Sequence, residues 1–238
     1  MNVAIIPARG GSQRIPLKNI REFCGKPMLA WSIEAALQSR CFARVIVSTD
    51  NQEIADVARH YGAEVPFLRP RLLADAHTGL EAVIWHGVEW LDAAGMDLNY
   101  VCCVFATAPF LTSAALRDGL AALEQAPLRQ FSISVTSYPF PVQRAVRITA
   151  DACIEPLYPE FMKTRSQDLE SAFHEAGQFF WARPEALRQR LSVYAPGASA
   201  PVVIPRWRVQ DIDTMEDWAQ AELLFRALRT VPDDANCI

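Results

Sequence analysis

The sequence predicts one α/β domain built on a mostly parallel sheet with helices on both faces. Short apolar runs alternate with amphipathic helical patterns through about the first 135 residues. Such alternation is typical of parallel strands joined by right-handed crossovers, with helices covering the sheet. A length of 238 residues, of which 51% are apolar, is enough to bury a large core.

The first elements are indicated by apolar runs and helix-start signals. Residues 3–6 are the first predicted strand, and a helix begins near Pro27, which suits a first helical position. Residues 44–48 are the second predicted strand. Asp50 then stands three residues before Glu53, the spacing of a capping box, so we expect the next helix to open at Asp50.

The later elements follow in the same order until the pattern changes. Strands are predicted at 64–67, 100–105 and 132–136, and helices at 78–94, 113–125 and 214–228.

Residues 137–181 hold several prolines, short strand-like pieces and few helix signals. We interpret them as an arm inserted in a domain of residues 1–230, with a flexible tail at 231–238. The arm's apolar residues would expose a large patch on a monomer, which favours a dimerisation interface. The alternative is that they pack on their own domain.

Composition and charge exclude several classes of partner. The net charge of −4 gives no long-range attraction to nucleic acid or to an anionic membrane. The apolar run 3–6 is too short for a signal peptide or a membrane span and has no basic flank. Six cysteines are scattered without a C-x-x-C pair, which favours a cytoplasmic protein with free thiols over a zinc site.

A glycine-rich turn after the first strand carries the first candidate site. Its adjacent glycines permit a tight turn whose backbone N–H groups converge on an anion. Cationic side chains follow at the carboxyl end of the strand, where open α/β sheets bind ligands. The predicted triphosphate-binding residues here are Ala8, Arg9, Gly10, Gly11, Ser12, Arg14, Lys18 and Asn19. A surface turn with solvated cations is the alternative.

This turn does not match the two common nucleotide-binding motifs. The pattern G-x-x-x-x-G-K-[ST] is absent, and G-x-G-x-x-G cannot be written through the loop. A kinase or an NAD-dependent oxidoreductase therefore loses its main support.

Two carboxylates near the C-terminus form the second candidate site. In Asp211-Ile212-Asp213 the alternation of a strand would point both carboxylates to one face and Ile212 into the core. One or two carboxylates completed by phosphates and water are the ligands that Mg²⁺ prefers. The alternative is that Asp213 or Thr214 caps the last helix together with Asp217.

A third group of polar residues lies in the expected arm. The stretch 163–168 and Gln178 are unusually polar for so apolar a chain. Arg165 could hold a sugar carboxylate, and Gln167 and Gln178 could bind hydroxyl or acetamido groups. Solvated side chains are the alternative, and we interpret His174 in that way.

Several segments together resemble the CMP-sugar-acid synthetases, cytidylyltransferases that act on sialic-type and related sugar acids. They are the loop 7–19, Val47-Ser48-Thr49-Asp50, Leu68-Arg69-Pro70, Thr107-Ala108-Pro109 and Val209-Gln210-Asp211-Ile212-Asp213-Thr214. The segments most similar to the pseudaminic acid cytidylyltransferases within that family are 24–28, 106–110 and Arg165-Ser166-Gln167-Asp168-Leu169. The resemblance covers nearly the whole chain.

The resemblance implies a Rossmann-like sheet of the nucleotide-diphospho-sugar transferase type, a homodimer, and Mg²⁺ on Asp211 and Asp213. The implied reaction transfers CMP from CTP to a nonulosonic sugar acid and releases pyrophosphate. The anomeric hydroxyl would attack the α-phosphorus in line, so that positioning and charge neutralisation carry most of the rate. The general base stays open between Asp211 and a metal-bound hydroxide.

The resemblance also implies roles for particular side chains. It places the cytosine near Arg69 and the loop up to Thr78. Thr107, in the fourth matching segment, is assigned to the sugar site. The predicted catalytic residues are Arg9, Lys18 and Asp211.

Two positions depart from the family pattern. Gln13 stands where the family often has lysine, so Arg14 would take over one phosphate contact. Phe105 stands where the sialic acid enzymes usually carry glutamine. An apolar side chain suits a more deoxygenated sugar with a methyl end, so we expect pseudaminic acid as the substrate. A CMP-sialic or CMP-legionaminic acid synthetase, and a non-catalytic nucleotide-sugar binding protein, are the alternatives.

Overall fold

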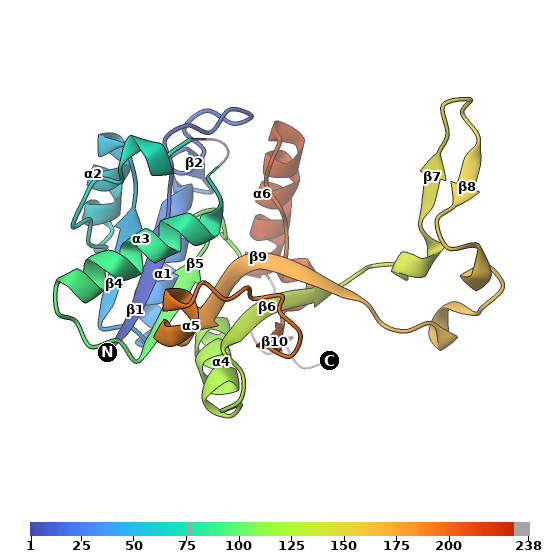
Figure 1. Cartoon of the computed structure of the whole chain (residues 1–238). Coiled ribbons are helices and arrows are strands. Elements are labelled where there is room, and N and C mark those ends of the chain that lie inside the picture. Colours follow the sequence, from blue (N-terminus) through green and yellow to red (C-terminus); the bar gives the residue numbers. More distant parts are fainter. Residues whose placement is uncertain (76–77, 231–238) are drawn as a thin grey trace.

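The computed structural model describes residues 1–75 and 78–230, and a six-stranded sheet forms their centre (Figure 1). The strands lie in the order β10 (Ser199–Val203), β6 (Phe131–Ser137), β9 (Phe173–Ala182), β5 (Tyr100–Val104), β1 (Asn2–Pro7) and β4 (Arg44–Ser48). β1 pairs in parallel with β4 and β5, and β6 with β10, whereas β9 runs antiparallel between β5 and β6. The predicted mostly parallel sheet is confirmed.

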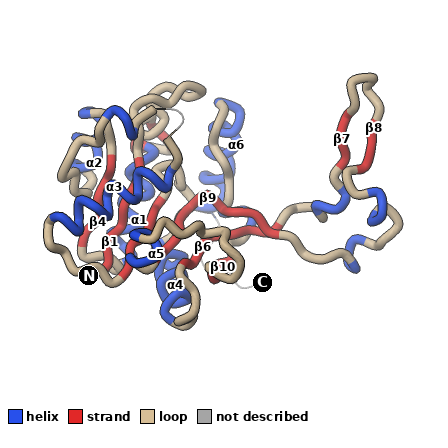
Figure 2. Tube along the Cα trace, viewed as in Figure 1, coloured by secondary structure: helices blue, strands red, loops and turns tan. Residues whose placement is uncertain are grey.

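Helices cover both faces of the sheet because alternate strand residues point to opposite sides. Ala4 and Ile6 belong to a core under α1 (Met28–Ser39), α2 (Gln52–His60) and α4 (Ser113–Glu124). Val3 and Ile5 belong to a second core under α3 (Leu80–Ala93) and α5 (Pro184–Arg188). All four side chains are fully buried. Figure 2 shows the helices on either side of the strands.

Two helices approach the sheet closely at glycines. A Cβ on Gly87 of α3 would lie 2.8 Å from Ile5 Cδ1. A Cβ on Gly119 of α4 would lie 2.5 Å from Phe179 and 2.8 Å from Trp181, both on β9. These positions therefore need glycine because of packing against the strands.

A third core, around α6 (Met215–Thr230), joins the two ends of the chain. Phe23 of the hairpin β2 (Glu22–Phe23) and β3 (Lys26–Pro27) contacts Trp218 and Phe225 of α6, with ring centroids 5.4 Å apart in both pairs. Ile15 and Ile212 are buried in the same cluster. Because Ile15 follows the glycine-rich loop and Ile212 separates the two aspartates, this core brings both predicted sites together.

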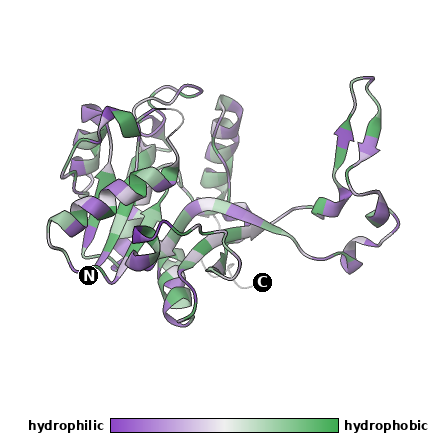
Figure 3. Ribbon diagram, viewed as in Figure 1, coloured by the Kyte–Doolittle hydropathy of each residue, from purple (hydrophilic) through white to green (hydrophobic). Residues whose placement is uncertain are grey.

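Residues 138–172 leave the body of the protein as an arm (Figure 1). It carries the antiparallel hairpin of β7 (Val146–Ile148) and β8 (Ile154–Pro156). Ile148 is 77% exposed and Phe140 is 79% exposed. Figure 3 shows hydrophobic residues on this hairpin, away from the main core. The arm was predicted to reach residue 181, but the structure places Phe173–Ala182 in the central sheet.

Two local predictions differ from the structure. Residues 64–67 do not form a strand: Glu64 makes an isolated bridge to Ile46 of β4, and the next bridge joins Leu68 to Thr49. Pro66 between them has no N–H for a ladder. The cap of α2 is Asn51, whose side chain accepts the N–H of Ile54 at 3.0 Å, and not Asp50. Asp50 accepts a bond from Gly10 instead.

Short 3₁₀ turns complete the fold at Arg71–Leu73, Val142–Arg144, Pro159–Phe161, Ser166–Asp168 and Arg206–Arg208. Among the residues described, no helix has the length and apolar character needed to cross a membrane. The predicted tail at 231–238 lies outside the described residues.

Candidate active site

The glycine-rich loop uses three of its backbone N–H groups inside the protein. Gly10 donates to Asp50 Oδ1 at 3.0 Å, and Ser12 donates to the Gly10 carbonyl at 3.0 Å. Ala8 donates to a β4 carbonyl at 2.9 Å. Of these four residues in the described chain, only Gly11 has an N–H without an intramolecular acceptor. Of the Gly10, Gly11 and Ser12 amides that were predicted to hold phosphates, only that of Gly11 is therefore without an acceptor inside the described chain.

A buried ion pair lies beneath the loop. Arg69 is 4% exposed, and its Nη2 lies 3.5 Å from Asp50 Oδ1, the same oxygen that accepts the Gly10 N–H. Burial lowers the pKa of Arg69, and the neighbouring Asp50 carboxylate opposes that shift. The side chain predicted to lie near the cytosine thus supports the loop from below.

A cavity of about 400 Å³ opens beside the loop at the carboxyl ends of β1 and β5. Seven of the predicted residues line it, namely Arg9, Ser12, Arg14, Lys18, Asn19, Thr107 and Asp213. Leu80 and Phe105 form an apolar part of the wall, and Asp213 lies on the acidic side. The side-chain amide of Asn19 is 2.9 Å from the Arg9 carbonyl and donates to it, which fixes the backbone of the loop.

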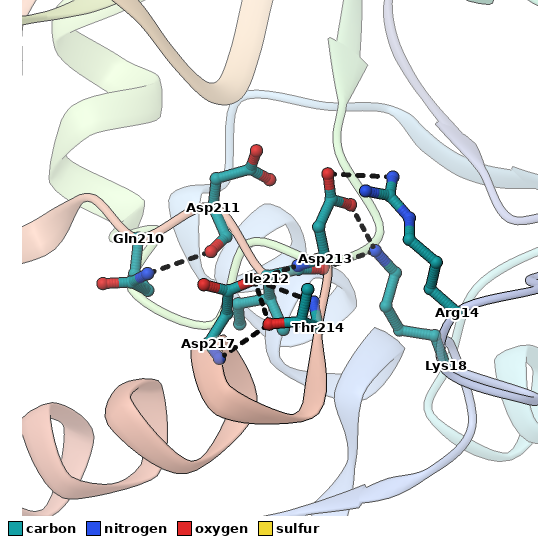
Figure 4. Close-up of polar contacts among 8 residues, drawn as sticks. All are labelled: Arg14, Lys18, Gln210, Asp211, Ile212, Asp213, Thr214 and Asp217. Carbon is teal, nitrogen blue, oxygen red and sulfur yellow. Dashed lines mark hydrogen bonds and ion pairs between the residues drawn. The ribbon is translucent and has the colours of Figure 1, made fainter. Parts of the chain in front are cut away.

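The cations of the loop meet Asp213 directly (Figure 4). Arg14 Nη2 lies 2.9 Å from Asp213 Oδ2. Lys18 Nζ donates to the carbonyl of Ile212 at 2.6 Å and lies 3.4 Å from Asp213 Oδ1. Residues 195 positions apart in the sequence are thereby joined in one charged cluster.

Thr214 and Asp217 cap α6. This bears on whether Asp213 is a helix cap or is available to bind a metal. The N–H of Asp217 donates to Thr214 Oγ1 at 3.2 Å, and Asp217 Oδ2 accepts from the N–H groups of Thr214 and Asp213. The Thr214 hydroxyl donates to Asp217 Oδ2 at 2.8 Å, and this bond, together with those from the two N–H groups, holds the pKa of Asp217 below its usual range. The side chains of Asp211 and Asp213 are therefore not needed for capping.

The segment 211–213 is not a strand, yet it keeps the predicted alternation. Ile212 is 1% exposed, and Figure 4 shows the carboxylates of Asp211 and Asp213 on the same side of the chain. Within the described residues no hydrogen bond or ion pair reaches the Asp211 carboxylate. The described residues contain no cluster of three or more histidine, cysteine or acidic side chains able to hold a metal. Two carboxylates nevertheless suit an ion that takes its other ligands from phosphates and water.

Comparison with known proteins identifies the family to which the chain belongs. Residues 3–149, more than half of the chain, match the model of the cytidylyltransferase family. This chain is a cytidylyltransferase. It is 38% identical over 225 residues to the pseudaminic acid cytidylyltransferase of Campylobacter jejuni (strain 81-176), covering 94% of this chain and 96% of the relative.

Two further relatives extend the comparison. The cytidylyltransferase is 33% identical over 232 residues to the CMP-N,N'-diacetyllegionaminic acid synthase of Legionella pneumophila, covering 94% and 95% of the two chains. A solved CMP:2-keto-3-deoxy-manno-octonic acid synthetase with CTP has the same fold, with a TM-score of 0.69 and 16% identity. That likeness covers 95% of this chain and 99% of the other.

Nine predicted site residues of the cytidylyltransferase are not among those that line the cavity beside the loop, namely Ala8, Gly10, Gly11, Arg69, Thr78, Arg165, Gln167, Gln178 and Asp211. Thr78 donates its hydroxyl to Asp75 at 2.7 Å and holds the turn before α3. Arg165 and Gln167 lie exposed on the arm, which projects away from β1 (Figure 1). Gln178 is 3% exposed and lines a separate cavity of about 480 Å³ between α4 and β10.

Sequence reasoning missed the role of two neighbouring residues. Asp50 holds the loop through Gly10, and the Asn51 side chain packs against Gly10 itself. The signal was present, because Val47-Ser48-Thr49-Asp50 is one of the matching segments. The spacing of Asp50 to Glu53 instead indicated a helix cap, and the bond from Gly10 to Asp50 was therefore not predicted.

Proposed function

We propose that this cytidylyltransferase transfers CMP from CTP to pseudaminic acid, giving CMP-pseudaminic acid and pyrophosphate. The observation that carries the proposal is the cavity beside β1, where three cations and Asp213 surround a space of nucleotide size. The Campylobacter relative, named for this reaction, aligns along almost the entire chain. Phe105 in the cavity wall supports a sugar acid with an apolar end.

The cavity residues divide between the two ends of the reaction. The anomeric oxygen of the sugar forms a bond to the α-phosphorus while the bond from that phosphorus to the pyrophosphate oxygen breaks. Arg9, Arg14 and Lys18 would stabilise the negative charge on the departing pyrophosphate. The proton of the anomeric hydroxyl would pass to the Asp211 carboxylate oxygen that is not used to hold a metal ion, since this carboxylate has no intramolecular partner among the described residues. Gly11 would donate its N–H to a phosphate oxygen.

We also propose that Mg²⁺ is required and that Asp211 and Asp213 hold it. The donor set fits, since both groups are carboxylates on one side of a short segment next to the triphosphate cavity. When bound, the ion would offset phosphate charge and polarise the α-phosphate.

Replacing Asp213 tests the metal assignment, because we expect the substitution to favour CTP binding without metal and to impair the enzyme with Mg²⁺. Without metal, Asp213→Asn removes a carboxylate that competes for Arg14 and Lys18. We expect CTP to bind the variant several-fold more tightly in EDTA, since exposed ion pairs contribute about 0.2–1 kcal/mol. With Mg²⁺, turnover should fall at least about a hundredfold, because a metal ligand is lost. Calorimetric titration with CTP, with and without Mg²⁺, measures the affinities, and pyrophosphate release with Mg²⁺ measures the turnover. Equal changes in affinity in the two conditions, or wild-type turnover, would contradict the assignment.

A homodimer would complete the site. Arg165 and Gln167 project with the arm, so they could reach a sugar acid only in the cavity of a second copy. The exposed apolar residues of the arm support such an interface, among them Phe140, Ile148 and Ile154. We place this dimer in the cytoplasm, in agreement with five free cysteines in the described chain.

Mixing two inactive variants tests the dimer and its shared site. Arg165→Ala damages the arm, and Asp211→Ala damages the cavity. In a symmetric dimer with random exchange, the mixture should recover about one quarter of wild-type activity, because one site of each mixed dimer is intact. No recovery, with subunit exchange confirmed by mass spectrometry, would show that the arm does not act across the interface.

The substrate assignment is tested by pyrophosphate release. CTP, UTP, ATP and GTP are each combined with pseudaminic, legionaminic or N-acetylneuraminic acid and Mg²⁺. Release only with CTP and pseudaminic acid is the expected result. Release with another acid would change the substrate and keep the reaction class. CTP binding without release from any pair would favour a nucleotide-sugar binding protein.

A further inference from the structure

A second cavity, of about 420 Å³, shares a wall with the nucleotide cavity. Leu80 and Phe105 line both cavities, so the two spaces lie on either side of these side chains. The floor of the second cavity is apolar and comes from Ile133, Phe179 and Phe180. It lies between the sheet, the start of α3 and the loop that carries Tyr194.

An irregularity in β9 forms this hollow. Ile133 pairs with Phe180 and Val135 pairs with Glu175, so β9 uses more residues than β6 over the same stretch. Gly177 has a φ of +62° at this bulge, a conformation that suits glycine. Such bulges re-aim side chains next to functional sites. Here the bulge turns Gln178 to the opposite cavity while Glu175 lines this one.

The rim of the hollow is acidic and held in place. The hydroxyl of Tyr194 donates to Glu175 Oε2. Glu81, in the first turn of α3, also lines the cavity. Burial and the two nearby carboxylates raise the pKa of Tyr194 to about 12, so its hydroxyl stays protonated and remains a donor to Glu175 at neutral pH.

This distribution of charge orients a sugar acid. The carboxylate of the substrate is repelled by Glu81 and Glu175 and attracted by the cations around the loop. Amide N–H groups and hydroxyls can donate to the acidic rim, and methyl groups can pack on the apolar floor.

Resting on the proposed function, we infer that this cavity binds the acetamido- and methyl-bearing half of the sugar acid. Glu175 and Tyr194 determine specificity there: Glu175 accepts a substrate N–H, and Tyr194 positions Glu175. Neither side chain takes part in bond formation.

Two conservative variants test this inference. Glu175→Gln removes the charged acceptor, and Tyr194→Phe removes the hydroxyl that positions it while keeping the ring. We expect each to raise the KM for pseudaminic acid, by about tenfold for Glu175→Gln, because a site that hydrogen-bonds a substrate N–H loses affinity when its acceptor is weakened. The dissociation constant for CTP and the melting temperature should stay at wild-type values.

Matched controls are available away from the cavity. Glu124→Gln, at the end of α4, and Tyr61→Phe, after α2, make the same chemical changes. Both should leave the KM for pseudaminic acid unchanged. A third variant, Val193→Trp, fills the cavity from its loop wall and should abolish turnover while CTP still binds.

The outcomes separate this inference from the proposed function. Wild-type KM for pseudaminic acid in Glu175→Gln and Tyr194→Phe, or full turnover in Val193→Trp, would overturn the sugar cavity and leave the reaction intact. No pyrophosphate release by the wild-type protein with CTP and any of the three acids would overturn the proposed function, and this inference with it.

Discussion

Replacing Gly10 by alanine tests how closely the loop packs against α2. An added Cβ would lie 2.9 Å from Asn51 Cβ and 3.1 Å from Asn51 Nδ2, whereas ordinary contact begins at 3.4 Å. The loop must therefore move by about half an ångström. Asn51 cannot simply turn away, because its side chain caps α2 through Ile54. The shift also stretches the 3.0 Å bond from Gly10 to Asp50.

The expected cost follows from these contacts. Overpacking of a tight site costs about 1–3 kcal/mol, and we expect Gly10→Ala to lower the free energy of unfolding by about 1–2 kcal/mol, since the loop is partly exposed. Affinity for CTP should fall about tenfold, the equivalent of about 1.4 kcal/mol. Urea unfolding and calorimetric titration with CTP measure the two effects. Gly11→Ala is the matched control for stability, because a Cβ there meets nothing within 4 Å.

A second substitution separates the steric explanation from a general loss of loop flexibility. Asn51→Gly removes the clashing Cβ, and a glycine cap costs only a few tenths of a kcal/mol. In the double variant CTP affinity should return to near the wild-type value. Asn51→Ser keeps a Cβ and should not restore it. Additive effects of Gly10→Ala and Asn51→Gly would refute the contact as the cause.

Three further predictions concern stability, specificity and assembly. The bidentate ion pair with Arg188 lowers the pKa of Asp92, so its stabilisation is present above the unfolded pKa near 4 and is lost as pH falls through the lower folded value. Asp92→Asn should thus lower the melting temperature by about 1–3 °C at pH 7 and by less at pH 3, measured by calorimetry. Phe105→Gln should lower kcat/KM for pseudaminic acid about tenfold and reduce the ratio of kcat/KM for pseudaminic acid to that for N-acetylneuraminic acid. An unchanged ratio in parallel assays would contradict the role of the apolar wall. Ile148→Asp on the arm should halve the mass in light scattering, whereas Leu128→Asp, equally exposed on the body, should not.

Periodicity alone predicted most of the fold. The helix at 113–125 appears as α4, and the apolar run 3–6 lies in β1, because each element buries a continuous apolar pattern of its own. The antiparallel strand β9 could not be recognised in the same way. Its alternation is broken at the Gly177 bulge, and its place in the sheet depends on pairing with β5 and β6 rather than on its own residues.

The sequence was sufficient to predict which residues belong to the candidate site, but not how those residues contact one another. The sequence indicated that Lys18 and Asp213 belong to one site, yet their approach depends on Ile15 and Ile212 being buried in one core. Arg69 illustrates the limit. A lone arginine in a matching segment gives no indication of burial, and only the fold shows it beneath the loop rather than in the cavity.

The charges of the assembled site support the proposal that the reaction requires a metal ion. The cluster around the loop contains four cationic side chains and three carboxylates, namely Arg9, Arg14, Lys18, Arg69, Asp50, Asp211 and Asp213. Its net charge is thus +1, whereas a nucleoside triphosphate carries about −4 at neutral pH, so the protein alone leaves most of that charge unbalanced. A divalent ion on the two aspartates would turn their negative charge from a repulsion into an attachment point for the phosphates. We therefore expect the aspartate pair to weaken triphosphate binding in the absence of metal and to strengthen it in the presence of metal.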